Sequence, residues 1–179
     1  MKSPDVILVN EQDEAIGTME KMEAHHKGLL HRAFSVFVIN DAGEMLLQRR
    51  ALEKYHSAGL WTNACCSHPF PGETIAAAAH RRLQEEMGFD CELQEIFTFT
   101  YRAEFDNGLT EHEFDHVLLG TYNGNIHPNP SEVCDYHYLS AARINELMKE
   151  EPAAYTIWFH RALPLVLQYI TVNAGATGR

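Results

Sequence analysis

A short acidic run at residues 111–116, EHEFDH, carries five ionisable side chains in six positions. Side chains alternate along a strand, so a strand here would place Glu111, Glu113 and Asp115 on one face. Two carboxylates that lie two residues apart on one face can bind a single cation together. A solvated strand face gives the same pattern, so the run alone leaves both interpretations open.

A second group of reactive side chains occurs at residues 65–68, CCSH. A thiol can carry or accept a proton when its surroundings adjust its pKa, and an imidazole can bind a metal ion. Further candidate imidazoles occur at His25 and His31. A single histidine is more often structural or exposed than a ligand, so none of these residues identifies a site alone.

The cationic side chains are few and unevenly distributed. The chain has 14 Lys and Arg against 25 Asp and Glu, and its formal charge of −11 argues against a nucleic-acid surface. Several cations nevertheless fall close together in the sequence: Arg49, Arg50, Lys54, Arg81 and Arg82. Such clustering in an acidic protein indicates a local anion site.

Length and composition limit the class of protein. A chain of 179 residues with 45% hydrophobic residues suits one domain with a substantial core. No apolar run reaches the roughly 18 residues of a membrane span. The apolar core of the opening segment is too short for a signal peptide. The four cysteines lack zinc-finger spacing and indicate reduced thiols. We therefore expect a cytoplasmic protein that binds neither membrane nor nucleic acid.

Strands are predicted wherever short apolar, β-rich runs are bounded by turn signals. These runs are residues 6–9, 33–39, 45–48, 61–64, 93–105, a run ending at 122, and 134–139. The turn at 40–43 predicts a hairpin between the second and third runs, and the turn at 106–108 predicts an antiparallel pair. The segment 65–68 is expected to be a loop, and 49–60 is expected to be a binding loop.

Helices are predicted from the spacing of apolar residues and from capping signals. Residues 74–87 have a buried stripe of helical period, and Gly88 follows as a cap. Ser140 can cap a helix that runs to about residue 148, and residues 155–172 form a last helix with a kink at Pro164. Residues 18–27 fit either helix or loop. We expect one domain over 1–172 and a flexible tail over 173–179.

The segment from Ser67 to Phe89 resembles a Nudix box, G-x5-E-x7-R-E-U-x-E-E-x-G-U, in which U is a bulky apolar residue. The residues in register are Glu73, Arg81, Leu83, Glu85, Glu86, Gly88 and Phe89. Ser67 replaces the opening glycine, and Arg82 replaces a glutamate that helps Nudix hydrolases to hold their catalytic cation. The resemblance implies an α+β fold, a Nudix-like mixed sheet flanked by helices in a single compact domain, with altered chemistry.

Other segments together resemble type I isopentenyl diphosphate isomerase, a family that shares the Nudix scaffold. In chain order they are HHKGLLHRAFS at 25–35, Arg49-Arg50-Ala51-Leu52 with Lys54, Trp61-Thr62-Asn63 with Cys66-x-His68-Pro69, Tyr101-Arg102-Ala103, Glu111-x-Glu113, and Trp158. The similarity spans residue 5 to about residue 165. It implies an enzyme that interconverts isopentenyl diphosphate and dimethylallyl diphosphate through a tertiary carbocation-like state.

The resemblance also implies the metal ligands. One divalent cation would be held by His25, His31, His68, Glu111 and Glu113. This donor set suits Mn²⁺ or Mg²⁺, and Zn²⁺ or Fe²⁺ could also occupy it. A second cation, Mg²⁺ that arrives with the substrate diphosphate, would lie near Glu86 and the backbone of Cys66.

The resemblance implies the remaining roles as well. The cations that meet the phosphates would be Lys21, Arg50, Lys54 and Arg82. Cys66 and Glu113 would exchange protons with the substrate, Tyr101 would assist the carboxyl group, and Trp158 would face the developing cation. Local cations can lower a thiol pKa from its reference near ~8.5, which suits Cys66 to proton transfer. Glu113 could donate a proton only if burial or its neighbours keep it protonated, whereas a bound metal would favour the carboxylate.

Two other functions fit parts of the sequence. A Nudix hydrolase of a nucleoside diphosphate derivative would use Glu85, Glu86 and Mg²⁺, but Arg82 argues against it. A noncatalytic metal-binding or scaffold protein would keep the metal ligands and tolerate the loss of Cys66. Neither gives a role to Cys66, Tyr101 and Trp158 together. The sequence leaves the oligomeric state open between monomer and homodimer.

Overall fold

The central strand of the structure is β3 (His31–Ile39), which is buried along most of its length. The structure is a computed structural model that describes residues 4–174. Strand β3 pairs in parallel with β8 (Thr110–Thr121) and antiparallel with β6 (Cys65–Ser67). A strand that is covered on both faces and paired on both sides is expected to read as a continuous apolar run, as residues 33–39 do.

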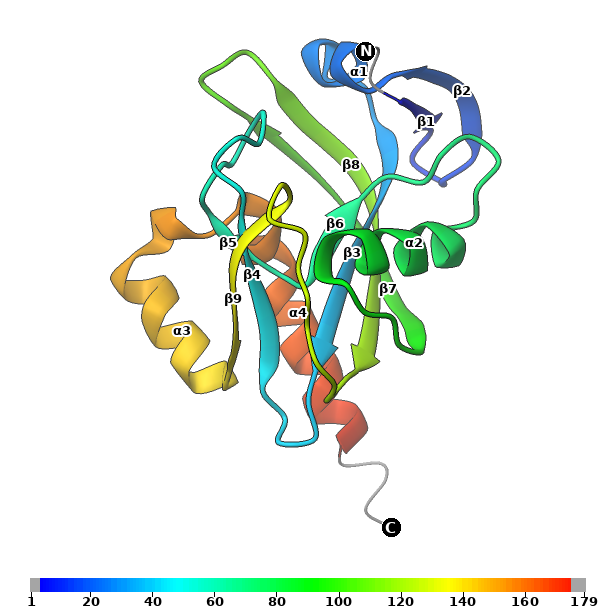
Figure 1. Cartoon of the computed structure of the whole chain (residues 1–179). Helices are drawn as coiled ribbons and strands as arrows, with labels where there is room; N and C mark the ends of the chain where they lie inside the picture. Colours follow the sequence, from blue (N-terminus) through cyan, green and yellow to red (C-terminus); the bar gives the residue numbers. More distant parts are fainter. Residues whose placement is uncertain (1–3, 175–179) are drawn as a thin grey trace.

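The sheet is mixed and curled, and it has nine strands within residues 4–174 (Figure 1). The other strands are β1 (Asp5–Val9), β2 (Ala15–Glu20), β4 (Met45–Arg50), β5 (Trp61–Thr62), β7 (Leu93–Glu104) and β9 (Val133–Leu139). Strands β7 and β8 form the expected antiparallel pair around the turn at 106–108. The predicted mixed sheet of a single compact domain is therefore confirmed.

Successive side chains of β3 point to opposite sides, so both faces of the sheet carry apolar side chains. One helix covers each face. Helix α2 (Ile75–Met87) packs in one apolar cluster with Phe34, Val36 and Val38. Helix α4 (Ile157–Ala174) packs in the other cluster, in which Phe37 stacks on Phe159 at 6.1 Å between ring centroids. The shorter helices are α1 (Lys21–Lys27), α3 (Ala141–Glu150) and the 3-10 turn η1 (Pro152–Ala154).

The predicted helix signals are confirmed at α2 and α3. The hydroxyl of Thr74 accepts a hydrogen bond from the Ala77 N–H at 3.2 Å, and Gly88 ends α2 with a φ of 72°. Ser140 caps α3 through the Arg143 N–H at 3.2 Å. Helix α4 contains Pro164, as expected, and continues through residue 174; the rest of the expected tail, 175–179, lies outside the described residues.

One local prediction was confirmed only in part, and another was wrong. The expected hairpin forms at its turn, where β3 and β4 pair antiparallel at Ile39 and Met45, but β4 then turns away to pair with β5 and β9 while β3 pairs with β6 and β8. Residues 65–67 form strand β6 and are not a loop. The ambiguous segment 18–27 is divided between the end of β2 and α1. Within residues 4–174, no helix is long and apolar enough to cross a membrane.

Candidate functional site

Strand register brings the candidate site together. The parallel pairing of β3 with β8 places His31 beside Glu113, and the antiparallel pairing of β7 with β8 places Tyr101 on the other side of Glu113. The three predicted acidic residues of β8 share one buried face: Glu111, Glu113 and Asp115 are 2%, 8% and 1% exposed. The interpretation of residues 111–116 as a solvated strand face is therefore wrong for these carboxylates.

Helix α1 presents His25 to the same place. The Glu20 carboxylate accepts a hydrogen bond from the Glu23 N–H at 2.9 Å, and Gly28 ends the helix in the left-handed region with a φ of 62°. His25 Nδ1 lies 2.6 Å from the Lys21 carbonyl oxygen, which can only accept, so Nδ1 carries the hydrogen. His31 is held in the same way, with Nδ1 2.8 Å from the Leu29 carbonyl.

This tautomer leaves the Nε2 lone pairs of both imidazoles free to bind a cation. Neither Nε2 atom has a hydrogen-bond partner among residues 4–174, although both rings are fully buried. Buried polar atoms are rarely left without a partner. A metal ion would satisfy both nitrogens, so the residues present fit a divalent cation.

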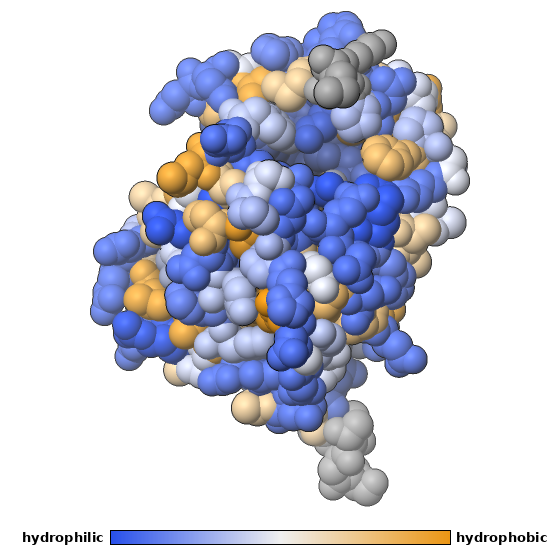
Figure 2. Space-filling view, in the orientation of Figure 1, coloured by the Kyte–Doolittle hydropathy of each residue, from blue (hydrophilic) through white to orange (hydrophobic). Residues whose placement is uncertain are grey.

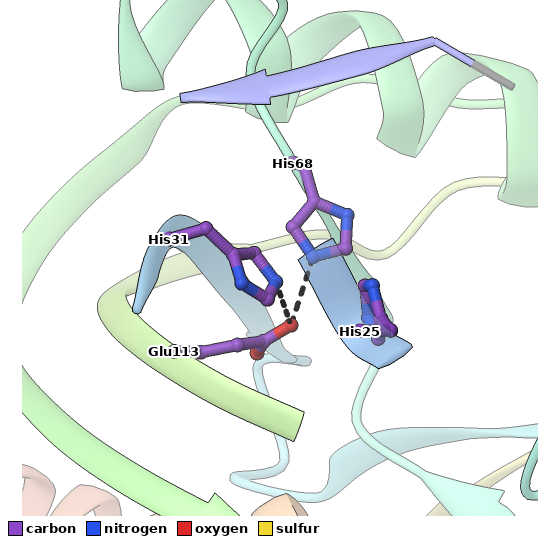
Figure 3. Close-up of side chains that lie close together, drawn as sticks. All are labelled: His25, His31, His68 and Glu113. Atoms are coloured by element: carbon purple, nitrogen blue, oxygen red, sulfur yellow. Dashed lines mark hydrogen bonds and ion pairs between the residues drawn. The ribbon is translucent and has the colours of Figure 1, made fainter. Parts of the chain in front are cut away.

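Four of the five predicted metal ligands converge. One ligand atom from each of His25, His31, His68 and Glu113 lies within 4.8 Å of the others (Figure 3). The Glu113 Oε1 atom is 2.8 Å from His68 Nε2 and 3.6 Å from His31 Nε2. Burial opposes protonation of His25, but its contact with Glu111 outweighs burial and raises the His25 pKa. Burial and then the charges of His31 and Lys21 lower the His68 pKa well below its usual range, so this imidazole favours the neutral form that can bind a cation.

The fifth predicted ligand, Glu111, belongs to an overlapping group with His25 and His56. Its Oε1 atom lies 2.6 Å from His56 Nε2 and 3.4 Å from His25 Nε2. We did not identify His56 from the sequence, because it lies in the segment 49–60, which has no periodic pattern. The only sequence feature that could have identified His56 is that it lies close in sequence to the predicted cations Arg50 and Lys54.

A single pocket joins most of the predicted site residues. It is lined by Lys21, Arg50, Lys54, Tyr55, His56, Cys66, Ser67, His68, Arg82, Glu86, Tyr101, Glu111, Glu113 and Trp158. Of the predicted set, only His25 and His31 are missing from this lining, and both lie fully buried beside it. Hydrophilic residues predominate over α1 and α2 on the face shown in Figure 2.

The four predicted phosphate-facing cations all line this pocket. Lys21 lies 4.4 Å from the centroid of the Tyr55 ring, and Arg50 lies 5.2 Å from that of Trp158. Lys54 forms an ion pair with Glu132, a residue that we did not predict, and Arg82 approaches the same carboxylate at 3.4 Å. Burial and then the charge of Lys54 lower the Lys21 pKa, so an anion here would relieve repulsion.

Glu86 is held at the end of α2. Arg82 Nη2 donates to its Oε1 atom at 2.5 Å, and Gln48, also not predicted, donates to Oε2 at 2.9 Å. The box residues Glu73 and Arg81 form a bidentate pair, with two contacts of 2.8 Å, that braces the loop before α2. Arg82 therefore occupies the position of the missing glutamate as a cation beside Glu86.

The surroundings of Cys66 and Glu113 shift their pKa values in opposite directions. Burial raises the Cys66 pKa to about 12 and outweighs the opposing charge of Arg50. Burial also disfavours ionisation of Glu113, but its contact with His31 and the Tyr101 hydroxyl, which donates to Glu113 Oε2 at 2.7 Å, lower that pKa to about 2. Burial thus favours the protonated thiol, and the contacts of Glu113 favour the ionised carboxylate.

Comparison with known proteins first defines the class. A sequence profile described as NUDIX domain matches residues 29–159. A crystal structure from Deinococcus radiodurans is similar with a TM-score of 0.64 and 20% identity over 85% of this chain and 99% of that chain. A MutT protein from Methanosarcina mazei is similar with a TM-score of 0.59 and 16% identity over 84% and 96% of the two chains. These structures establish a Nudix fold.

Closer relatives define the family. The chain is 52% identical to the isopentenyl-diphosphate Delta-isomerase of Burkholderia multivorans over 87% of this chain and 88% of that protein. It is 50% identical to the enzyme of the same name from Pectobacterium atrosepticum over 94% of both chains. The chain therefore belongs to the isopentenyl-diphosphate Delta-isomerase family.

Proposed function

We propose that this protein is an enzyme that interconverts isopentenyl diphosphate and dimethylallyl diphosphate for isoprenoid biosynthesis. The observation that carries the proposal is the single pocket that contains both Cys66 and Glu113, beside the histidine cluster and the cationic side chains. The sequence identities of 52% and 50% to relatives named isopentenyl-diphosphate Delta-isomerase support the same function. Arg82, in place of the hydrolase glutamate, supports an isomerase over a hydrolase.

The chemistry requires one group that gives a proton and another that accepts one. Moving the double bond by one carbon adds a proton to the terminal alkene carbon and removes a proton from the allylic carbon. We assign these two roles to Cys66 and Glu113, which together hold one transferable proton: the Cys66 thiol carries it, and the ionised Glu113 carboxylate can accept one. Tyr101 is assigned to orient the carboxylate through its hydroxyl.

The pocket also has to protect a carbocation-like state from water. Trp158 is 3% exposed and lines the pocket, and its ring centroid lies 5.2 Å from the Arg50 guanidinium carbon. An aromatic face can stabilise a nearby cation electrostatically. We therefore assign Trp158 to face the reacting carbons and to exclude water from them.

We assign a divalent cation to His25, His31, His68 and Glu113, with Glu111 as the fifth ligand. When bound, it would supply a fixed positive charge beside the reacting groups. Nitrogen and carboxylate donors together suit Mn²⁺, Mg²⁺ or Zn²⁺. A second ion, Mg²⁺ carried by the substrate diphosphate, is assigned to Glu86 and the backbone of Cys66.

The diphosphate is assigned to the cations that line the pocket: Lys21, Arg50, Lys54 and Arg82. A small diphosphate is the partner that this charge distribution favours. We also propose a cytoplasmic location, which the four free cysteines support because a reducing compartment keeps thiols unpaired. A single domain over residues 1–172 remains our proposed organisation.

The proposal can be tested on purified protein with isopentenyl diphosphate and Mg²⁺. Allylic diphosphates ionise readily in acid whereas isopentenyl diphosphate does not, so product is measured as acid-labile diphosphate over time. We expect time-dependent formation of dimethylallyl diphosphate that stops when a chelator removes the divalent cations. No acid-labile product under these conditions, with folded and metal-loaded protein, would contradict the proposal.

A further inference from the structure

We propose that His56 is a positioning residue that holds Glu111 at the metal cluster by donating a hydrogen bond from Nε2. The distance between His56 Nε2 and Glu111 Oε1 is 2.6 Å, shorter than that between Glu111 and any other imidazole that contacts it. The inference rests on the metal site proposed above. It adds a residue from the loop at 51–60, which the family resemblance did not include.

The hydrogen-bond direction follows from the chemistry of the two groups. An ionised carboxylate only accepts hydrogen bonds, so the imidazole nitrogen beside it must carry the hydrogen. His56 Nδ1 then has a lone pair and can accept from the Ser57 hydroxyl, which lies 3.2 Å away. His25 and His31 have the opposite tautomer, with their Nε2 lone pairs directed to the cluster.

This contrast separates two roles for imidazoles at one site. His25 and His31 can bind a cation directly, whereas the Nε2 atom of His56 is occupied by its hydrogen bond. Outer partners of this kind fix the orientation of a ligand, and their loss typically weakens metal binding by about 10–100-fold. The other oxygen of Glu111 lies 3.3 Å from the Tyr101 hydroxyl, but that hydroxyl donates its one hydrogen to Glu113 at the shorter distance of 2.7 Å, so His56 is the better-placed donor to Glu111.

The surroundings of His56 keep its ring in place. The ring is stacked on Phe105 at 5.2 Å between centroids, and Trp158 contacts it edge-on at 5.8 Å. Its backbone carbonyl accepts a hydrogen bond from Arg50 Nη2 at 3.2 Å, and the side chain is almost fully buried. His56 therefore connects the loop that carries a proposed phosphate-binding cation to a proposed metal ligand.

Two variants separate the hydrogen bond from the packing. His56→Phe keeps an aromatic ring between Phe105 and Trp158 but has no donor. His56→Gln loses the ring packing but has an amide that can donate to Glu111. His26→Ala is the control, because His26 is next to a proposed ligand but its imidazole is exposed. The His26 ring forms a hydrogen bond with the Met22 carbonyl of its own helix.

The measurement is the dissociation constant for Mn²⁺, obtained by titrating the metal-free full chain and recording free Mn²⁺ by electron paramagnetic resonance. We expect His56→Phe to bind about 10–100-fold more weakly than the unmodified protein, and His56→Gln and His26→Ala to bind within a few-fold of it. Pulsed resonance spectra of bound Mn²⁺ should show the same number of coordinated nitrogens in all four proteins.

Three outcomes would overturn the inference. Unchanged Mn²⁺ affinity in His56→Phe, with weaker binding in His56→Gln, would show that packing is what matters. Loss of a coordinated nitrogen in His56→Phe would make His56 a direct ligand. Failure of the unmodified protein to bind Mn²⁺ would contradict the proposed metal site as well, whereas the first two outcomes leave that site intact.

Discussion

Adjacent thiols in β6 have opposite environments because strand side chains alternate. Cys65 is fully buried in the cluster under α2, and Cys66 lines the pocket. We predict that Cys66→Ala lowers the isomerisation rate by at least ~10²–10⁴-fold, the typical contribution of a proton-transfer group. Cys65→Ala should keep most of the activity and lower the unfolding free energy by about 1 kcal/mol. Steady-state rates and urea unfolding of both variants would test this.

Equal loss of activity in the two cysteine variants, with equal stability, would contradict the assignment. Cys66→Ser gives a further control, since it keeps the size of the side chain and raises the pKa of the acidic group. We expect it to be nearly as inactive as Cys66→Ala.

Arg82 is surrounded by acidic residues. Its guanidinium donates to Glu85 at 2.7 Å and to Glu86 at 2.5 Å, and it lies 3.4 Å from Glu132. We predict that Arg82→Glu strongly raises KM for isopentenyl diphosphate, because it adds a fourth carboxylate where the diphosphate is expected. Arg82→Gln should raise KM less. A gain of efficient nucleotide hydrolysis in Arg82→Glu would contradict the account.

The sequence predicted most of these residues, but it missed some of their partners. Cys66 and Arg82 lie in motifs with fixed spacing, so their place could be predicted from the chain. His56, Glu132 and Gln48 contact the site across long sequence separations and lie in no such motif. Their contacts depend on how β4, the loop after it and the loop before β9 pack together.

At the scale of elements, the register between β3 and β8 sets the metal cluster. The sequence predicted both strands, and it predicted the β7–β8 pair through its turn at 106–108. It did not predict that β3 pairs in parallel with β8, because a parallel pair is joined by a long connection with no local turn signal. The same gap explains why the predicted hairpin at 33–48 pairs only next to its turn.

The end of α2 gives a prediction about stability. A Cβ atom on Gly88 would lie 2.1 Å from the His127 carbonyl oxygen, and its φ of 72° disfavours any side chain. We predict that Gly88→Ala lowers the unfolding free energy by about 2–5 kcal/mol, the sum of backbone strain and overpacking. It should also lower activity, because the loop that starts near His127 carries Glu132, which pairs with the proposed phosphate-binding residues Lys54 and Arg82.

Gly43→Ala is the matched control. Gly43 has a similar φ of 75°, and nothing lies within 4 Å of an added Cβ. Only the backbone strain of about 1–2 kcal/mol should remain there, with activity unchanged. Equal destabilisation of the two variants in chemical unfolding would show that the contact with His127 does not matter.

At the scale of the whole molecule, metal binding should stabilise the fold. The proposed ligands come from α1, β3, β8 and the segment after β6, so the ion would connect parts of the chain that are distant in sequence. A ligand at 100 times its dissociation constant adds about 2.7 kcal/mol to the unfolding free energy. We predict that Mn²⁺ raises the melting temperature and that a chelator reverses the effect.

Variants at the cluster should remove this stabilisation. His31→Ala and His68→Ala are expected to show little or no rise in melting temperature with Mn²⁺ and to contain less metal after purification. His80→Ala is the control, since His80 lies on α2 and its imidazole pairs with Asp90, beyond the end of that helix, at 2.6 Å. A full rise with Mn²⁺ in both cluster variants would contradict the proposed ligands.

The central claim is that the whole molecule moves a double bond and leaves the diphosphate intact. The most direct test is nuclear magnetic resonance of isopentenyl diphosphate with the unmodified protein and Mg²⁺ in deuterated buffer, following carbon-bound protons and phosphorus in one sample. The account predicts dimethylallyl diphosphate, deuterium in the new methyl group, and no released phosphate. Mg²⁺-dependent phosphate release from nucleoside diphosphate compounds in parallel samples, with no dimethylallyl product and no deuterium uptake, would contradict it.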